Sequence, residues 1–226
     1  MNENAASVSD SIALAPARIS IGVTGHRDSN AAFAAHLPEI EKALERIFEC
    51  IDGVTAKHSD IVGTTRLHAL LALGSDMIAV DHALKRGWEV TAPLPFGLDL
   101  NIAINVSTDN LAEARAVLKR EQCANIEVEE KAIIIREASS RVRLFQLTEQ
   151  DRHVTDLFIA KLSEPANTRA ALDYNTIVAE RVASAGRLMI EQSNILIAIW
   201  DGVTPGAIGG TRHTISAAVN LGTPVI

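Results

Sequence analysis

Apolar residues in the first part of the chain recur at two spacings, one typical of strands and the other typical of helices. Short runs rich in β-branched and aliphatic residues predict strands at 18–23, 67–73 and 88–94. Longer segments with apolar residues three or four positions apart predict helices at 30–52 and 77–86, and Gly87 ends the second helix. The third strand is expected to stop at Pro95, because proline has no N–H for a central ladder. Strands joined by helices predict a parallel sheet.

The alternation is interrupted by a polar, charged stretch, which we interpret as an inserted α+β segment at about 97–170. Within it, helices are expected near 110–121 and 151–162, and the runs 132–136 and 141–147 could pair as a hairpin. After it, we expect a helix at 171–192, a strand at 194–200, a helix at 212–221 and a strand at 223–226. The whole pattern predicts a single Rossmann-like domain over 18–226, with three α/β/α layers and a mainly parallel sheet.

Composition narrows the class of protein. Hydrophobic residues make up 47% of the 226 residues and aromatic residues only 4%, so aliphatic side chains must form most of the core. The 21 basic and 28 acidic residues leave a formal net charge of −7, which opposes general nucleic-acid binding. A small phosphate ligand is still compatible with this charge, because the N–H groups at a helix start bind anions without net positive charge.

The two ends of the chain bear on localisation. Residues 1–17 lack the cationic start and apolar core of a secretion signal, and we expect them to be a mobile leader. No run approaches the roughly 20 apolar residues that cross a bilayer, and Cys50 and Cys123 are not in metal-ligand spacing, so a cytoplasmic protein is expected. The residues before Ile226 resemble the start of a buried strand. We therefore expect an effector module after residue 226, through which the protein could associate with a membrane.

Polar loops follow four of the predicted strands, and in an open parallel sheet such loops converge on the rim where ligands bind. The most informative loop, 201–211, leads from a strand into a helix. Its glycines let a phosphate approach the backbone, and the N–H groups of the first helical turn bind the anion; the alternative is an ordinary flexible turn. The expected ligand-binding residues are Thr24, Gly25, His26, Arg27, Gly74, Ser75, Asp76, Asp201, Gly202, Gly206, Gly209, Gly210 and Thr211, with Pro95 and Phe96 as pocket walls.

Several of these residues have structural alternatives. Arg27 offers a planar fork to phosphate oxygens, but it could also be solvated or paired with the adjacent aspartate. His26 could contact a base or sugar, or it could serve the loop alone. One of Ser75 and Asp76 is expected to cap the helix that follows. Asp201 could accept ribose hydroxyls or form an Asp-Gly turn.

The remaining residues indicate no metal, cofactor or nucleophile. His68, His82, His153 and His213 have no partners at ligand spacing. Neither cysteine has a recognisable base nearby in sequence, and no G-x-S-x-G motif occurs. The glycine-rich loop also matches neither the Walker pattern nor G-x-G-x-x-G.

An ordered set of motifs resembles the SLOG superfamily. The motifs are Gly22-Val23-Thr24-Gly25-His26-Arg27, Gly74-Ser75-Asp76 with Ala79 and Ala83 before Pro95-Phe96, Asp201-Gly202 followed by Gly209-Gly210-Thr211, and Pro224-Val225-Ile226. This superfamily includes the Lonely Guy phosphoribohydrolases, the DNA-processing protein A family and nucleotide-sensing domains of bacterial defence systems. The chain looks most like sensor domains that precede effector modules. The resemblance implies a nucleotide-type ligand, a homo-oligomer and a role in antiphage signalling.

The favoured function is a sensor that binds a phosphorylated nucleotide or a nucleotide-derived signal, ADP-ribose-like or cyclic, and passes it to an effector module or assembly. The first alternative is an N-glycoside hydrolase of nucleoside monophosphates. In the phosphoribohydrolases a glutamate follows the glycine-rich turn, whereas Thr214 stands at the matching place here. A hydrolase would therefore need a carboxylate from another position, such as Glu180 or Glu191 on the preceding helix.

A DNA-processing protein is the third expectation. It would need a local basic patch, and Arg136, Arg141 and Arg143 are the candidates. We interpret this cluster as the solvated face of the expected hairpin, because the net charge is negative and no aromatic residues are interleaved with a basic run.

Overall fold

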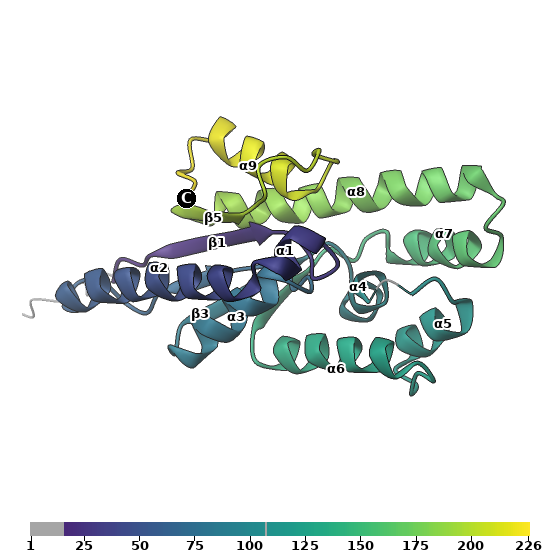
Figure 1. Ribbon diagram of the computed structural model, residues 1–226, viewed down its shortest axis with the longest axis horizontal. Helices are drawn as coiled ribbons and strands as arrows, with labels where there is room; N and C mark the ends of the chain where they lie inside the picture. Colours follow the sequence, from purple (N-terminus) through teal and green to yellow (C-terminus); the bar gives the residue numbers. More distant parts are fainter. Residues whose placement is uncertain (1–15, 107) are drawn as a thin grey trace, which may run out of the picture.

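The computed structural model describes residues 16–106 and 108–226, and at its centre a parallel sheet lies between two layers of helices (Figure 1). The strands are β1 (Ser20–Gly25), β2 (Arg66–His68), β3 (Glu89–Leu94), β4 (Arg143–Gln146) and β5 (Ile195–Ile199). Their order is β4-β3-β2-β1-β5, and every neighbouring pair is parallel. The predicted class, a Rossmann-like three-layer α/β/α fold, is confirmed.

Strand β1 is buried in the middle of the sheet. Ile21 and Val23 are 0% and 1% exposed, and Ile21 pairs with Leu67 of β2 on one side and with Ile195 of β5 on the other. Such aliphatic residues, with few aromatic ones, form the core on both faces of the sheet, as expected for parallel strands covered by helices. The carboxyl end of β1 therefore lies between the loops that follow its two neighbours.

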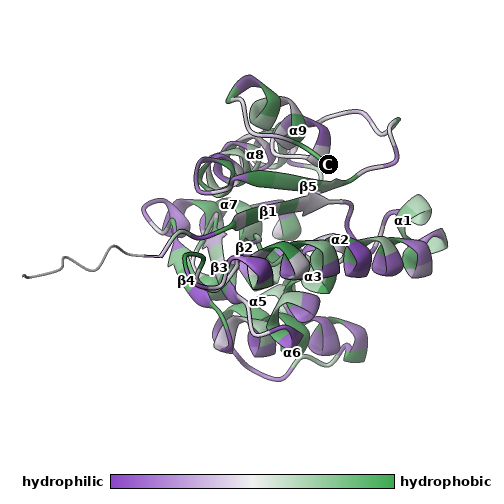
Figure 2. Ribbon diagram, turned by 90° about the vertical axis from the view of Figure 1, so that its left-hand side faces the viewer, coloured by the Kyte–Doolittle hydropathy of each residue, from purple (hydrophilic) through white to green (hydrophobic). Residues whose placement is uncertain are grey.

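One face of the sheet is covered by α2 (Leu37–Lys57), α3 (Ser75–Lys85) and α6 (Ile126–Ser140), with α1 (Ala31–Ala35) preceding α2. Helix α3 packs against β1 and β3, and α2 and α6 lie beside it (Figure 1). Hydrophobic residues concentrate on the strands and on the inward sides of these helices, whose outer sides are hydrophilic (Figure 2). This amphipathic pattern gives each helix one face for the core.

The other face carries α8 (Thr168–Glu191) and α9 (Thr211–Asn220), and α7 (Asp151–Ser163) packs against α8. Helices α4 (Leu98–Asn105) and α5 (Leu111–Lys119) pack against each other and against α6. The helices expected near 110–121, 151–162, 171–192 and 212–221 are confirmed as α5, α7, α8 and α9. Helix α4 was not expected.

The helix expected at 30–52 is in fact two helices that meet at His36. The side chain of Asn30 caps α1 by accepting the N–H of Phe33 at 2.9 Å. Pro38 then lies in the first turn of α2, where its missing N–H breaks no helical hydrogen bond. In a continuous helix the N–H of residue 38 would donate to the carbonyl oxygen of Ala34, which a proline cannot do, so the proline separates the two segments.

The expected hairpin within 97–170 is wrong. Residues 132–136 belong to α6, where Val128, Ala132 and Ile135 are buried at a helical spacing. Asn125 caps this helix by accepting the N–H groups of Glu127 and Val128. Strand β4 instead pairs in parallel with β3, so the segment interpreted as an insertion supplies an edge of the main sheet and a helix of its cover. The basic cluster is therefore on no hairpin.

The second strand is shorter than predicted, because β2 ends at His68 instead of residue 73. The chain leaves the ladder where Leu71 adopts a left-handed conformation with φ 58°. The carboxylate of Asp76 accepts the N–H groups of Leu70 and Ala72 on either side of it. A side-chain acceptor thus replaces the neighbouring strand as the partner of these N–H groups.

The first and last described segments of the chain each make a bridge to a neighbouring segment. Most of the expected leader, residues 1–15, lies outside the described residues, whereas Ala17 bridges to Val62. At the other end the expected strand 223–226 is a single parallel bridge between Val225 and Leu196. Ile226 both donates to Leu196 and accepts from Ala198, each at 2.9 Å, which extends the sheet beyond β5.

Candidate functional site

A pocket of about 320 Å³ lies beyond the carboxyl ends of β1 and β5. The chain runs outward from β1 through β2, β3 and β4, and then returns to place β5 on the other side of β1. The connecting helices α2 and α3 cover one face of the sheet, whereas α8 and α9 cover the other. The loops after β1 and β5 therefore diverge, and this is the place where open parallel sheets bind ligands.

Loops distant in sequence meet at this pocket. Of the residues expected to bind a ligand, those that line it are Thr24, Gly25, His26, Arg27, Asp76, Gly209, Gly210 and Thr211. Those that do not line it are Gly74, Ser75, Asp201, Gly202 and Gly206, together with the expected walls Pro95 and Phe96.

The glycine-rich turn leads directly into α9. Gly209 has φ 79°, and a Cβ there would lie 2.9 Å from the carbonyl oxygen of Ala179 on α8, so the turn packs too closely for any side chain. Gly210 is the residue before α9, and no side chain of the described residues caps this helix. The N–H groups of the first turn are therefore free for an anion, beginning at Thr211.

Two arginines border the same pocket, Arg27 after β1 and Arg212 in the first turn of α9. Within residues 16–106 and 108–226, neither guanidinium makes an ion pair or a hydrogen bond, and Arg27 is not paired with Asp28. A Cβ on Gly206 would lie 3.0 Å from Cβ of Arg212. Gly206 thus makes room for the stem of Arg212 and does not face the pocket itself.

His26 joins three loops. Its backbone N–H donates to Ile199 of β5 at 3.1 Å, and its carbonyl oxygen accepts the N–H of Ser75 at 3.1 Å and the Ser75 hydroxyl at 2.9 Å. The backbone N–H of Asp201 donates to His26 Nε2 at 3.1 Å. Because this nitrogen accepts a hydrogen bond it carries no proton, so its 3.4 Å separation from Asp201 Oδ1 is not an ion pair. The His26 ring therefore joins the loop after β1 to the loop after β5, and His26 also lines the pocket.

Of the two roles expected for Asp201, a contact with ribose hydroxyls or an Asp-Gly turn, the structure shows the turn. Its carboxylate accepts the N–H groups of Val203 and Thr204 at 3.0 and 2.8 Å and also the Thr204 hydroxyl. The hydroxyl of Thr204, followed by these N–H groups, lowers the pKa of Asp201 well below its usual range. The oxygens are used within the loop, and Thr204 faces the pocket in place of Asp201.

Gly74 and Ser75 support the pocket from behind. Gly74 has φ 107°, and a Cβ there would lie 2.6 Å from the Asp28 nitrogen and the His26 oxygen, which no side chain tolerates. This contact brings the loop after β2 against the loop after β1, where Arg27 and Gly74 form a bridge. The hydroxyl of Ser75 points back to the His26 carbonyl. Neither Ser75 nor Asp76 caps α3, so the expected capping role is wrong.

Asp76 is the one carboxylate among the described residues that line the pocket. It is 6% exposed, and its Oδ2 accepts the N–H groups of Leu70 and Ala72 at 3.1 and 3.3 Å. Burial raises the pKa of Asp76 to about 6, and the two N–H groups and the charge of Arg27 counteract part of this effect. A buried carboxyl with such a pKa is unusual outside functional sites.

The remaining sequence candidates lie elsewhere. Phe96 is 1% exposed within the core, and the carbonyl oxygen of Pro95 accepts a hydrogen bond from Arg181. Glu180 lies on a surface hollow between α7 and α8. Glu191 forms an ion pair with Arg187 at 2.7 Å on the outer side of α8. Neither glutamate reaches the pocket, so the expected alternative sources of a catalytic carboxylate are not at the site.

Sequence reasoning missed one wall of the pocket, which consists of residues Val182, Gly186 and Met189 of α8. The helix pattern placed α8 against the sheet but did not indicate which of its turns passes the carboxyl ends of the strands. Arg212 and Thr214 were also missed as pocket residues, although both follow the glycine-rich turn by one helical turn or less. Their position at the start of α9 was the available signal.

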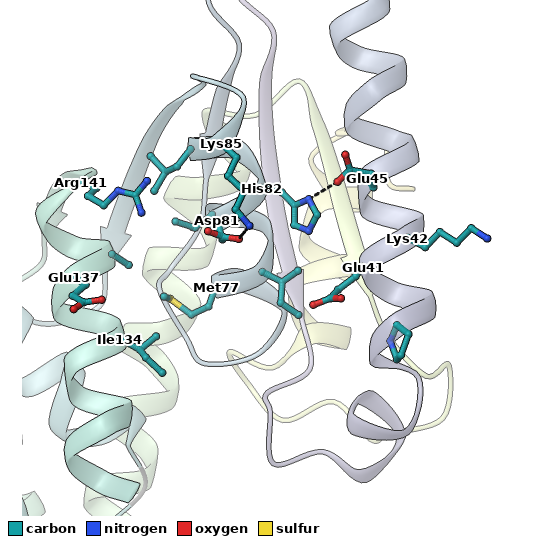
Figure 3. A pocket seen from close by; sticks show the side chains of 15 residues that line it. Glu41, Lys42, Glu45, Met77, Asp81, His82, Lys85, Ile134, Glu137 and Arg141 are labelled. Carbon is teal, nitrogen blue, oxygen red and sulfur yellow. Dashed lines mark ion pairs between the residues drawn. The ribbon is translucent and has the colours of Figure 1, made fainter. Parts of the chain in front are cut away.

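A larger hollow of about 780 Å³ lies between α2, α3 and α6 (Figure 3). Two pairs of polar groups face each other in it: His82 Nδ1 lies 2.7 Å from Glu45 Oε2, and Lys85 Nζ lies 2.5 Å from Asp81 Oδ2. Figure 3 shows Lys42 directed away from the hollow. No strand-end loop opens into it, so the smaller pocket at the sheet edge is the better candidate despite its size.

Among residues 16–106 and 108–226, no group of three or more His, Cys, Asp or Glu side chains is placed to hold a metal ion. In the same residues no helix combines the length and apolar character needed to cross a bilayer. Cys50 is exposed, Cys123 is buried, and both are free thiols.

Comparisons with known proteins do not place the chain in a family. No family model and no curated protein matches it. Among solved structures, the chain is similar to DNA processing protein A (DprA) from Streptococcus pneumoniae, with 16% sequence identity and a TM-score of 0.27. The similarity covers 92% of this chain and 58% of the DprA chain, so this chain spans a little over half of that protein's length. A TM-score this low does not establish a common fold.

Proposed function

We propose that the protein binds a phosphorylated nucleotide-type ligand in the pocket between the loops after β1 and β5. The observation that carries the proposal is the uncapped start of α9, bordered by the unpaired guanidiniums of Arg27 and Arg212. Free N–H groups, the helix dipole and two planar cationic forks all attract the same kind of group, a phosphate. The overall charge of −7 opposes the binding of long polyanions such as nucleic acids, so this local anion site favours small phosphorylated ligands.

The ligand acts as a signal in this proposal, in agreement with the resemblance to SLOG sensor domains. Thr214 stands where the phosphoribohydrolases have a glutamate; it lines the pocket and its hydroxyl donates to the Gly210 carbonyl at 3.2 Å. A hydroxyl cannot accept a proton as a carboxylate does near neutral pH. Binding energy would then shift a conformation or an assembly, and only the difference in affinity between the two states can do so.

One observation favours an N-glycoside hydrolase as a second candidate. Asp76 brings a carboxyl group with a pKa of about 6 into the pocket, and such a group can donate or accept a proton near neutral pH. In that case the ligand would be consumed, with release of a free base and a ribose phosphate.

The test begins with mass spectrometry of small molecules released from the denatured, purified protein, followed by calorimetry with nucleoside monophosphates, NAD and ADP-ribose derivatives. Binding without release of free base over many equivalents of ligand supports the sensor. Multiple-turnover release of base that disappears in Asp76→Asn but persists in Asp81→Asn, a half-buried position on the same helix that does not line the pocket, supports the hydrolase instead. No binding of any of these compounds overturns both.

A further inference from the structure

Asp76 is buried in the pocket with spare capacity to accept hydrogen bonds. Both of its hydrogen bonds go to Oδ2, and no cation of the described residues forms an ion pair with it. Oδ1 is not among the enclosed polar atoms that lack partners, although the residue is only 6% exposed, so this oxygen opens on the pocket that Asp76 lines. A buried polar group that lacks a protein partner is costly unless a ligand or water supplies one.

The other acidic residue near the pocket has no such capacity. The carboxylate of Asp201 is occupied by Val203 and Thr204 within its own turn, and it does not line the pocket. Of the two acidic groups that the sequence placed at this rim, Asp76 is therefore the one that can contact a ligand.

Position and charge decide which part of a ligand reaches Asp76. It follows β2, whereas the anion-binding start of α9 follows β5, and β1 lies between these strands. The N–H groups of Leu70 and Ala72 hold Asp76 at the loop after β2, on the other side of β1 from α9. A phosphate beside an ionised carboxylate would be repelled, so the phosphate belongs at α9 and an uncharged hydrogen-bond donor belongs at Asp76. In a nucleoside 5′-phosphate, the ribose hydroxyls are uncharged donors on the far side of the sugar from the phosphate.

We propose that Oδ1 of Asp76 accepts a hydrogen bond from the ribose 2′-hydroxyl and thereby selects ribonucleotides over 2′-deoxyribonucleotides. The proposal rests on the proposed nucleotide-binding function and names the ligand class of that site. Carboxylates that accept ribose hydroxyls are a known solution in dinucleotide sites of parallel sheets. With a pKa of about 6, the Asp76 carboxyl is mostly ionised at pH 7 and acts as an acceptor alone.

The test compares AMP, GMP, CMP and UMP with their 2′-deoxy counterparts by calorimetry at pH 7.5. The wild-type protein is expected to bind at least one ribonucleotide about tenfold or more tightly than its deoxy form, the difference typical of a hydrogen bond to a charged group. In Asp76→Asn, the amide oxygen still accepts from Leu70 and Ala72, and the group facing the pocket becomes a donor. The preference for the ribonucleotide should fall toward unity while affinity for the deoxynucleotide changes less than about twofold. Asp81→Asn on the same helix is the matched control and should retain the preference.

The outcomes separate the two proposals. Equal wild-type affinity for a ribonucleotide and its deoxy form overturns the role of Asp76 and leaves nucleotide binding intact. An equal loss for both forms in Asp76→Asn, with an unchanged preference, shows that Asp76 only supports the loop at Leu70 and Ala72. No binding of any of the eight compounds overturns this inference, whereas the proposed function is overturned only if NAD and the ADP-ribose derivatives also fail to bind. The wild-type comparison decides the matter even if the variant does not fold.

Discussion

The backbone N–H of Asp201 donates a hydrogen bond to Nε2 of His26 across 3.1 Å, which joins the loop after β5 to the loop after β1. The two residues are 175 positions apart, and the His26 side chain is only 10% exposed. This contact sets the two walls of the pocket at a fixed distance from each other.

Replacement of this acceptor should destabilise the protein. His26→Leu leaves the Asp201 N–H without a partner in a poorly exposed place, and we expect the free energy of unfolding to fall by about 1–3 kcal/mol. Urea denaturation followed by circular dichroism measures it. His153→Leu, at an exposed position of α7, is the control and should change stability by less than about 0.5 kcal/mol. Equal effects of the two substitutions would show that the hydrogen bond is not a structural link.

Gly210 should be required for binding more than for folding. Its φ of −79° suits any residue, but a Cβ there would lie 3.1 Å from the Ala207 oxygen, and a valine side chain would crowd the start of α9. We expect Gly210→Val to remain folded and to lose at least about tenfold in affinity for a phosphorylated ligand, since the N–H groups are no longer approachable. Calorimetry on the folded variant measures this loss, and unaltered affinity would remove the turn from the binding site.

Arg27 should distinguish a phosphorylated ligand from its nucleoside. Arg27→Ala removes a charge-assisted contact, so affinity for a nucleoside monophosphate is expected to fall about tenfold to 100-fold, whereas affinity for the nucleoside should change little. Arg187→Ala is the matched control, because Arg187 is paired with Glu191 on the surface of α8. Equal losses for the nucleotide and the nucleoside in Arg27→Ala would contradict a phosphate contact.

Alanine substitutions at two glycines should change the free energy of unfolding in opposite directions. Gly53 lies inside α2 with open space around its Cα, so Gly53→Ala should raise the free energy of unfolding by about 0.5–1 kcal/mol. Gly209 has φ 79° and packs against Ala179 and Val182, so Gly209→Ala should lower it by about 1 kcal/mol or more. Paired urea titrations measure both changes. A stabilised Gly209→Ala would mean that the turn relaxes away from α8.

Two buried groups should give the protein opposing pH dependences. Burial raises the pKa of Asp76 from 3.8 to about 6, and burial, with a smaller effect of Arg66, lowers the pKa of His68 from 6.5 to about 4. As pH rises from about 4 to 6, the unfolded state loses the Asp76 proton first, so this group reduces stability. Between about pH 4 and 6.5 the unfolded state binds the His68 proton more strongly, so stability rises with pH.

The single variants should separate these two effects. In Asp76→Asn, the free energy of unfolding should increase more steeply with pH between 4 and 6.5 than in the wild type, and in His68→Met it should decrease. Each contribution is at most about 3.5 kcal/mol, because a difference of one in pKa between the folded and unfolded states corresponds to about 1.4 kcal/mol. Urea titrations at pH 4, 5, 6 and 7 measure the slopes. Identical slopes in all three proteins would show that neither group has a shifted pKa.

Local chemistry made much of the fold predictable. Gly87 has φ 72° and ends α3, with its N–H bonded to Leu84 and the N–H of Trp88 bonded to Ala83, which is the capping arrangement that a glycine at this place indicates. The glycine-rich turn before α9 and the helices α5, α7 and α8 could likewise be predicted from the sequence, because each depends on residues a few positions apart. The convergence of the loops after β1, β2 and β5 at one sheet edge followed from the parallel order of the strands, whereas Pro95 and Phe96 after β3 do not line the pocket.

The sequence alone therefore determined helices α3, α5, α7, α8 and α9, the parallel order of β1, β2 and β3 and the turn that begins α9, since these depend on conformational preferences and contacts within one or two helical turns. The tertiary structure decided which strand β4 joins, which turn of α8 reaches the pocket, and which acidic residue faces it. Asp76 and Asp201 look alike in the sequence, as acidic residues in polar loops after strands. In the folded chain the carboxylate of Asp201 accepts the Thr204 hydroxyl, whereas the carboxylate of Asp76 accepts the N–H groups on either side of Leu71. Those partners come from backbone geometry and packing between distant segments, and no local pattern encodes them.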